Sequence, residues 1–178
     1  LLAGNETAAA SLILNFISGC RPEETVTGLG EHGLAVVFKG EDPGPTVAFR
    51  AELDAVPVAE ANRVAHSSRT AGVSHTCGHD GHAAIVAGLG LVLARRPLPR
   101  GRVVLLFQPA EETGVGAQRI IADDTFRRIA PEWIFALHNL PGHPRGQVIV
   151  GPGVFACAST GMVIQLSGVT SHAAHPEQ

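Results

Sequence analysis

Short apolar runs with strand character alternate along this chain with segments of helical periodicity, and this alternation limits the fold more than any other feature. Strands are predicted at residues 33–40, 46–53, 102–108 and 132–139, and helices at residues 5–19, 81–96 and 114–123. Strands that alternate with helices form sheets that the helices cover. The sequence therefore predicts an α/β fold with a mostly parallel core.

Boundary residues add detail to the first part of this pattern. Asn5 is a residue type that caps helices and Gly19 is one that ends them, so the first helix is expected between these positions. Residues 41–45, EDPGP, have the composition of a tight turn. We therefore expect the strands at 33–40 and 46–53 to be neighbours in the sheet.

Charge and hydropathy exclude two classes of function. The formal net charge is -3 and the basic residues are scattered, so no surface for nucleic acid is expected. No apolar run approaches the roughly 20 residues that cross a bilayer, so we expect no membrane span.

The three cysteines, Cys20, Cys77 and Cys157, are too few for a disulfide framework. A cytoplasmic location is the resulting expectation.

The amino-acid composition of the chain changes after His138. Residues 139–161 are rich in Gly and Pro and are predicted to be a connector, after which residues 161–168 alternate as a new strand. Because a strand has just begun there, we do not expect residue 178 to be a natural terminus. Leu1 is likewise not expected to be a natural start.

Polar groups follow several predicted strands at the point where each strand ends. Asp54, the pair Glu111 and Glu112, and His138 all occupy such positions. In open α/β sheets, sites form in the crevice outside the carboxyl ends of the strands, so these groups are expected to converge. Residues 75–82, HTCGHDGH, lie between a strand and a helix and can reach the same crevice.

The segment HTCGHDGH has two readings when taken alone. Cys77 and His79 are a good ligand pair for Zn²⁺ or a similar divalent ion. The alternative is a buried structural cysteine and a histidine that caps the following helix. A redox loop is excluded, because the second cysteine of a CxxC motif is missing.

The other polar groups favour the metal-ligand interpretation of Cys77 and His79 over the structural one. Adjacent carboxylates at Glu111 and Glu112 are costly to desolvate without a cation or a shared proton, although acidic residues also occur at solvated helix starts. His138 alone is more often a hydrogen-bonded histidine than a ligand. Together, one thiolate, two imidazoles and a carboxylate form a plausible ligand set.

Five blocks of sequence carry a resemblance to a known family. In order and spacing, residues 50–60, 75–84, 107–117, 135–142 and 171–176 resemble the amidohydrolase branch of the aminoacylase and carboxypeptidase-type dinuclear metallopeptidases. This branch includes indole-acetyl-amino-acid hydrolases, hippurate hydrolases and N-acetyl-diaminopimelate deacetylases. The resemblance implies a three-layer, zinc-peptidase-like catalytic domain over residues 1–153. It also implies an inserted α+β lid and dimerisation domain, of which only the start, residues 154–178, is present.

The resemblance also implies a set of metal ligands. Cys77 takes the position of a bridging aspartate, and His79 replaces a histidine that other branches have at Glu52. Glu112 and His138 are the remaining ligands of two divalent ions, which are Mn, Zn, Ni or Co in such enzymes. Family members complete the second metal site with a histidine near the C-terminus, for which this chain has no counterpart.

Catalytic roles follow from the same resemblance. Glu111 is the expected general base toward a metal-activated water, and Asp54 is expected to orient a ligand histidine. His172 resembles the lid histidine that stabilises the oxyanion and reaches the other subunit in dimeric relatives. His82 and His175 are expected to have structural roles.

The sequence thus predicts a metal-dependent amidohydrolase that cleaves N-acyl amino acids or related conjugates, as a homodimer formed through the lid domain. One alternative is a dipeptidase or carboxypeptidase of the same family. The other is a non-catalytic zinc-binding module, which would have a filled tetrahedral site where an enzyme keeps an open position.

Overall fold

The structure, a computed structural model, describes residues 2–158 and 161–175. The chain divides into two units, one that ends at Leu140 and one that begins at Pro141. All helices and strands found in the described residues lie in the first unit. Among the same residues, no helix is both long and apolar enough to cross a membrane.

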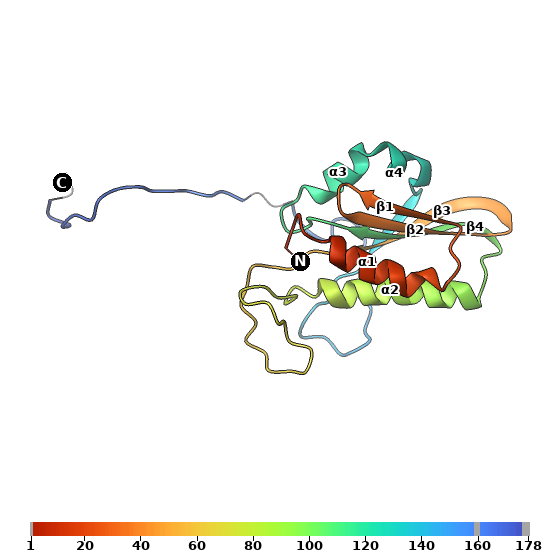
Figure 1. The fold of residues 1–178 in the computed structure, drawn as a ribbon, viewed down its shortest axis with the longest axis horizontal. Coiled ribbons are helices and arrows are strands. Elements are labelled where there is room, and N and C mark those ends of the chain that lie inside the picture. The colour runs from red at the N-terminus through yellow and green to blue at the C-terminus, as the bar shows by residue number, and fades with distance from the viewer. Residues whose placement is uncertain (1, 159–160, 176–178) are drawn as a thin grey trace. The chain divides into compact units, whose positions relative to one another are not determined.

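The first unit contains a sheet with helices on both faces (Figure 1). Its elements, in chain order, are α1 (Thr7–Ser18), β1 (Glu24–Leu29), β2 (Gly33–Lys39), β3 (Asp42–Glu52), α2 (His79–Arg95), β4 (Arg100–Gln108), α3 (Gly116–Ala122), α4 (Asp124–Ile129) and β5 (Trp133–Ala136). The strands and helices predicted between residues 5 and 139 are all present in this unit. Strand β1 and helix α4 were not predicted.

The sheet is mixed, which corrects the prediction of a mostly parallel core. Its strand order is β1-β2-β4-β3-β5. Pairs β1–β2 and β2–β4 are antiparallel, whereas β3–β4 and β3–β5 are parallel. The three strands whose carboxyl ends carry polar groups, β3, β4 and β5, are therefore parallel to one another.

The prediction that the strands at 33–40 and 46–53 are neighbours was wrong, because β4 lies between β2 and β3. Residues 41–45 form no tight turn, since β3 already begins at Asp42. The chain instead crosses the start of β4, where the N–H of Gly40 donates to the carbonyl of Gly101 at 2.8 Å. A Cβ atom at Gly40 would lie only 2.6 Å from the backbone of Arg100, so this crossing needs glycine.

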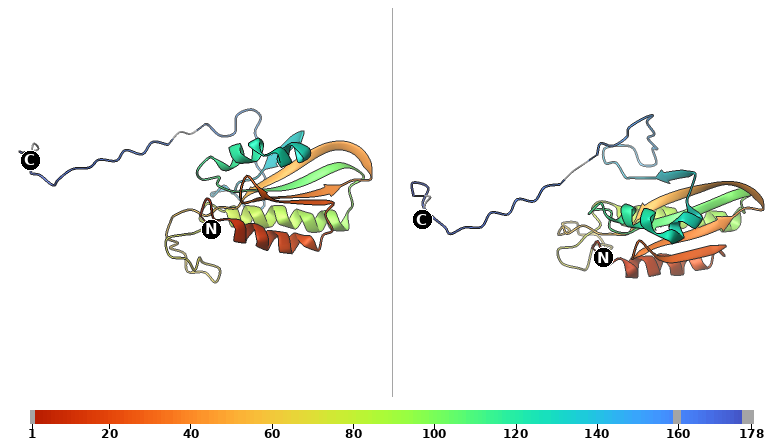
Figure 2. Two further views of the ribbon diagram at one scale, coloured as in Figure 1. Left: turned by 45° about the horizontal axis from the view of Figure 1, so that its top comes forward. Right: turned by 90° about the horizontal axis from the view of Figure 1, so that it is seen from above.

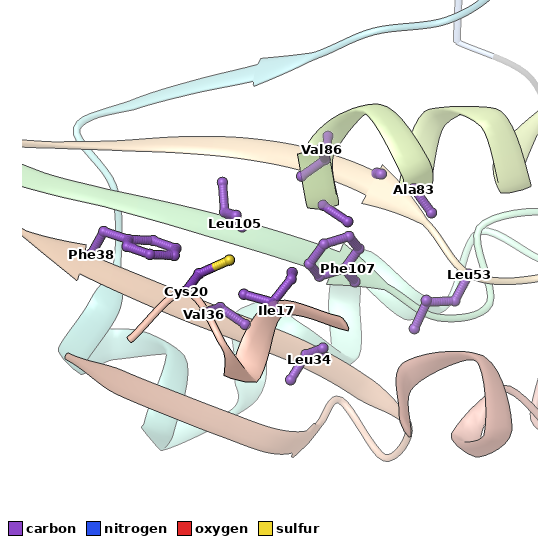
Figure 3. Packing of buried hydrophobic residues seen from close by; sticks show 12 residues of the cluster. Ile17, Cys20, Leu34, Val36, Phe38, Leu53, Ala83, Val86, Leu105 and Phe107 are labelled. Carbon is purple, nitrogen blue, oxygen red and sulfur yellow. The ribbon is translucent and has the colours of Figure 1, made fainter. Parts of the chain in front are cut away.

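Two apolar clusters hold the three layers together. Helices α1 and α2 cover one face of the sheet, and α3 and α4 cover the other (Figures 1 and 2). Alternate residues of β2 supply both clusters, as the period of two in a strand requires: Leu34, Val36 and Phe38 face α1 and α2 (Figure 3), while Ala35 and Val37 belong to the opposite cluster. The predicted three-layer α/β class is confirmed.

Helix α1 differs in detail from the prediction. It begins at Thr7 with Glu6, not Asn5, at the N-cap position, and no side chain caps it. It ends at Gly19 as predicted. The carboxylate of Glu6 is instead buried and accepts a hydrogen bond from the N–H of Ala110, far along the chain.

Ile17 and Leu12, both on α1, provide a matched test of how this helix packs. Ile17 is fully buried in the core, whereas Leu12 is 72% exposed. We expect Ile17→Ala to lower the free energy of unfolding by about 2–5 kcal/mol, because it removes buried methyl groups and leaves a cavity. Leu12→Ala should change it by less than about 0.5 kcal/mol. Urea unfolding of both variants checks this, and equal losses would contradict the packing described.

The second unit lacks helices and strands in residues 141–158 and 161–175. The strand predicted at 161–168 is therefore not formed, and that prediction was wrong. A strand requires a hydrogen-bonded partner, and no described segment pairs with these residues. A single isolated bridge joins His172 and His175.

Candidate metal centre

The predicted convergence of polar groups is present in the first unit. Asp54 lies two residues after β3, Glu111 and Glu112 follow β4, and His138 lies two residues after β5. His79 is the first residue of α2. The parallel direction of the three strands brings their carboxyl ends to one edge of the sheet, and α2 starts at that edge.

His79 occupies the middle of this cluster and is 1% exposed. Its Nδ1 lies 2.8 Å from the carbonyl oxygen of Asp54, to which it can donate a hydrogen bond. In that tautomer Nε2 keeps its lone pair, and it lies 3.7 Å from a carboxylate oxygen of each of Glu111 and Glu112. The imidazole is thus oriented with its ligating nitrogen toward two carboxylates.

Cys77 and His138 form the other side of the cluster. The Sγ atom of Cys77 lies 3.6 Å from Nε2 of His138. Burial, together with the nearby carboxylate of Glu112, raises the pKa of Cys77 to about 11. The thiolate therefore needs a cation to compensate its charge in this acidic setting, which a divalent metal ion would supply.

Asp54 is completely buried beneath these groups. One of its carboxylate oxygens accepts from the N–H of Glu112 at 3.0 Å, and the other lies 3.6 Å from Nδ1 of His79 without a hydrogen bond among the described residues. Burial opposes ionisation of Asp54, but the nearby imidazole of His79 and the hydrogen bond from the N–H of Glu112 hold its pKa below the ordinary value. Burial likewise opposes the charged form of His79, yet Asp54 raises the pKa of His79 to about 9.

The donor atoms form two groups, both containing His79, each of which could hold a divalent ion. Cys77, His79 and His138 form one group whose ligand atoms lie within 4.8 Å of one another, and His79, Glu111 and Glu112 form a second such group. Thiolate, imidazole and carboxylate together suit zinc and neighbouring divalent metals. One oxygen of buried Asp54 has no hydrogen-bond partner among the described residues, and the thiol of Cys77 has a raised pKa. A nearby cation would lower the free-energy cost of both negative charges.

A third acidic and histidine-rich group has its own hydrogen bonds. Nδ1 of His82 lies 2.8 Å from one carboxylate oxygen of Glu52, and the other oxygen of Glu52 pairs with Arg50. Nε2 of His82 lies 2.7 Å from the side-chain oxygen of Asn139, and its ring packs edge-on against that of His138 at 4.7 Å. The structural role expected for His82 agrees with this placement, since the ring supports the segment that carries His138.

His172 belongs to the second unit, where its Nδ1 accepts from the N–H of Ala174 at 3.2 Å. Its assignment to the oxyanion therefore stays a prediction. Sequence patterns missed Glu6 and Asn139, which contact the segments that carry the candidate residues. The only signal was an acidic residue beside an apolar helix for Glu6, and a polar residue after His138 for Asn139.

The segment that holds all of these strand-end groups matches a known family. Residues 48–176 match peptidase family M20/M25/M40. The chain belongs to this family. Its membership confirms the resemblance carried by the five sequence blocks, and it agrees with the mixed sheet and its covering helices.

Two curated relatives are similar in sequence to most of this chain. The M20 chain is 32% identical over 175 residues to the N-acetyldiaminopimelate deacetylase of Priestia megaterium, covering 98% of this chain and 46% of the relative. It is 37% identical over 148 residues to an uncharacterized hydrolase of Staphylococcus haemolyticus, covering 81% and 38% of the two chains. The M20 chain thus spans less than half the length of these curated relatives.

Solved structures show the same architecture. The M20 chain superimposes with a TM-score of 0.73 on a dinuclear metal-binding peptidase of the M20 family from Bacillus subtilis, at 31% identity and covering 80% of this chain and 40% of the other. A putative aminohydrolase from Staphylococcus aureus gives a TM-score of 0.70 at 33% identity, covering 77% of this chain and 36% of the other. Both likenesses confirm the predicted fold class.

Asp54 offers a test of how the centre is supported. We expect Asp54→Asn to weaken metal affinity by about 10–100-fold, because it removes the negative charge that lies 3.6 Å from Nδ1 of His79. Competition with a chromogenic chelator measures the affinity. Asp42→Asn, at the exposed start of β3, is the matched control and should bind as the wild type does. Equal affinity in the two variants would remove Asp54 from the support of the centre.

Proposed function

We propose that the protein is a metal-dependent amidohydrolase that cleaves the amide bond of N-acyl amino acids or related conjugates. The observation that carries this proposal is the pair of carboxylates that faces Nε2 of His79. Glu112 is enough to complete a ligand set, so Glu111 remains available to handle protons. A purely structural metal site has no use for such a group.

We assign the ligands as the resemblance implies. Cys77 would be shared between two divalent ions, of Mn, Zn, Ni or Co, while His79 and His138 would hold one of them and Glu112 the other. The ligand atoms of Cys77, His79 and His138 lie within 4.8 Å of one another, which supports their binding to a common ion. When bound, the ions would lower the pKa of water toward neutrality and polarise the scissile carbonyl.

The residues of the chain supply the proton chemistry. The side chain of Glu111 is 38% exposed, so it can reach both solvent water and a substrate. Its carboxylate takes a proton from the attacking water and later delivers that proton to the leaving amine nitrogen. Asp54 keeps His79 in one tautomer by holding its Nδ1 side, which directs Nε2 toward the carboxylates.

Four further assignments complete the proposal. His172 hydrogen-bonds the developing oxyanion, and the protein forms a homodimer through the lid domain, both as the resemblance implies. Residues 1–153 form the catalytic domain and residues 154–178 begin the lid. A cytoplasmic location is supported by Cys20, Cys77 and Cys157, none of which forms a disulfide.

A substrate panel tests the class of amide. The full-length protein is incubated with N-acetyl, N-benzoyl and indole-acetyl amino acids and with dipeptides, with and without added Mn²⁺. The proposal predicts metal-dependent release of the free amino acid from at least one N-acyl substrate. Cleavage of dipeptides alone would favour the peptidase alternative, to which the likeness with the Bacillus subtilis peptidase gives some support.

A further inference from the structure

A buried carboxylate at the start of α1 contacts the segment that carries the two glutamates of the centre. The side chain of Glu6 is completely buried. One of its oxygens accepts a hydrogen bond from the N–H of Ala110 at 2.8 Å, and the other has no hydrogen-bond partner among the described residues. The two residues are separated by 104 positions in the sequence, so this contact ties the first helix to the segment after β4.

Capping of α1 does not explain this carboxylate. Glu6 occupies the N-cap position, but its side chain makes no capping hydrogen bond. A buried carboxylate with only one hydrogen bond costs stability, because most of its solvation is lost. A position that served packing alone would favour an apolar side chain. The hydrogen bond with Ala110 therefore gives the reason for a carboxylate at this position.

The segment that receives this hydrogen bond has an unusual backbone. Ala110 has a φ of 49°, in the left-handed region that non-glycine residues seldom adopt. Its carbonyl accepts from the N–H of Gly116 at 3.1 Å and from the hydroxyl of Thr113 at 3.2 Å. Such a conformation persists only where the surroundings hold it, and the hydrogen bond from Ala110 to Glu6 is one of these restraints.

Two buried carboxylates thus restrain the backbone on either side of Glu111. Glu6 accepts from the N–H of Ala110, the residue before it, and Asp54 accepts from the N–H of Glu112, the residue after it. We propose that Glu6 is a positioning residue that, with Asp54, fixes the backbone of Glu111. This inference rests on the proposed function, in which Glu111 carries the proton.

Two substitutions of Glu6 distinguish a positioning role of its carboxylate from a role in packing. Glu6→Met fills a similar volume without an acceptor, whereas Glu6→Gln keeps an oxygen that can accept from Ala110. In the metal-loaded, full-length protein we expect Glu6→Met to lower kcat by roughly 10–100-fold, because a small displacement of a reacting group costs rate steeply. KM and the metal-to-protein ratio should stay within about twofold of wild type, and Glu6→Gln should recover most of kcat.

Ile17→Val is the control for a general loss of stability, since Ile17 lies on the same helix and contributes only to the core. A kcat for Glu6→Met equal to that of Ile17→Val, or an equal loss of kcat in Glu6→Met and Glu6→Gln, would overturn the proposal.

Amide hydrogen exchange gives a second readout that does not depend on turnover. We expect residues 109–116 to exchange faster in Glu6→Met than in Ile17→Val, and at the wild-type rate in Glu6→Gln. Unchanged exchange in Glu6→Met would contradict the restraint even if the wild-type enzyme is active. Faster exchange in a protein that hydrolyses no amide would keep the restraint and reject the proposed function instead.

Discussion

Glu111→Gln is expected to remove hydrolysis while leaving the metal in place. The amide keeps the size and hydrogen-bonding oxygen of the carboxylate but cannot accept the proton of the attacking water. General base catalysis contributes about 10²–10⁴-fold, so kcat should fall by at least roughly a hundredfold. Because Glu112 and the other proposed ligands are untouched, the metal-to-protein ratio measured by elemental analysis should remain near that of wild type.

Glu41→Gln is the matched control, since Glu41 is an exposed glutamate at the far end of β3 from the candidate centre. It should hydrolyse at the wild-type rate and bind the same amount of metal. Hydrolysis retained by Glu111→Gln would reject Glu111 as the base. A large loss of metal in that variant would instead make Glu111 a ligand, and the roles of the two adjacent glutamates would need to be exchanged.

Cys77→Ala is expected to lower the metal-to-protein ratio well below that of wild type. The proposed bridge contacts both ions, so its loss removes a ligand from each of them. The raised pKa of Cys77 gives the physical reason for its dependence on the metal: burial and neighbouring carboxylates disfavour the thiolate unless a cation is present. Metal binding should therefore release the thiol proton, and affinity should fall as the pH is lowered.

Cys157→Ala is the control for this variant, because Cys157 is exposed and lies in the second unit. Its metal content should match that of wild type. A Cys77→Ala protein with an unchanged metal ratio would remove Cys77 from the ligand set. Stability curves of both variants should accompany the metal analysis, so that unfolding is not mistaken for the loss of a ligand.

The convergence of the candidate residues could be predicted because it depends on strand direction alone. Asp54, Glu111 and His138 all follow predicted strands, and the ends of parallel strands meet at one edge of a sheet. Their place in the site needed no knowledge of which strands are neighbours. The roles assigned to them depend on chemistry that the fold alone does not test.

Strand order and long-range hydrogen bonds could not be predicted in the same way. The turn-like composition of residues 41–45 indicated that the flanking strands are neighbours, but the apolar strand β4 pairs with both β2 and β3 and lies between them. Glu6 lies at the start of a predicted helix, and only the folded chain brings its carboxylate to Ala110. Such contacts depend on tertiary packing, which leaves no local pattern in the sequence.

Metal titration of the metal-free, full-length protein, with hydrolysis of an N-acetyl amino acid followed in parallel, tests the central claim most directly. The account predicts that hydrolysis is absent without metal and rises with added Mn²⁺ or Zn²⁺ until two ions are bound per chain. Saturation at one tightly held ion with no hydrolysis would contradict it, and would identify the cluster around His79 as a structural metal site.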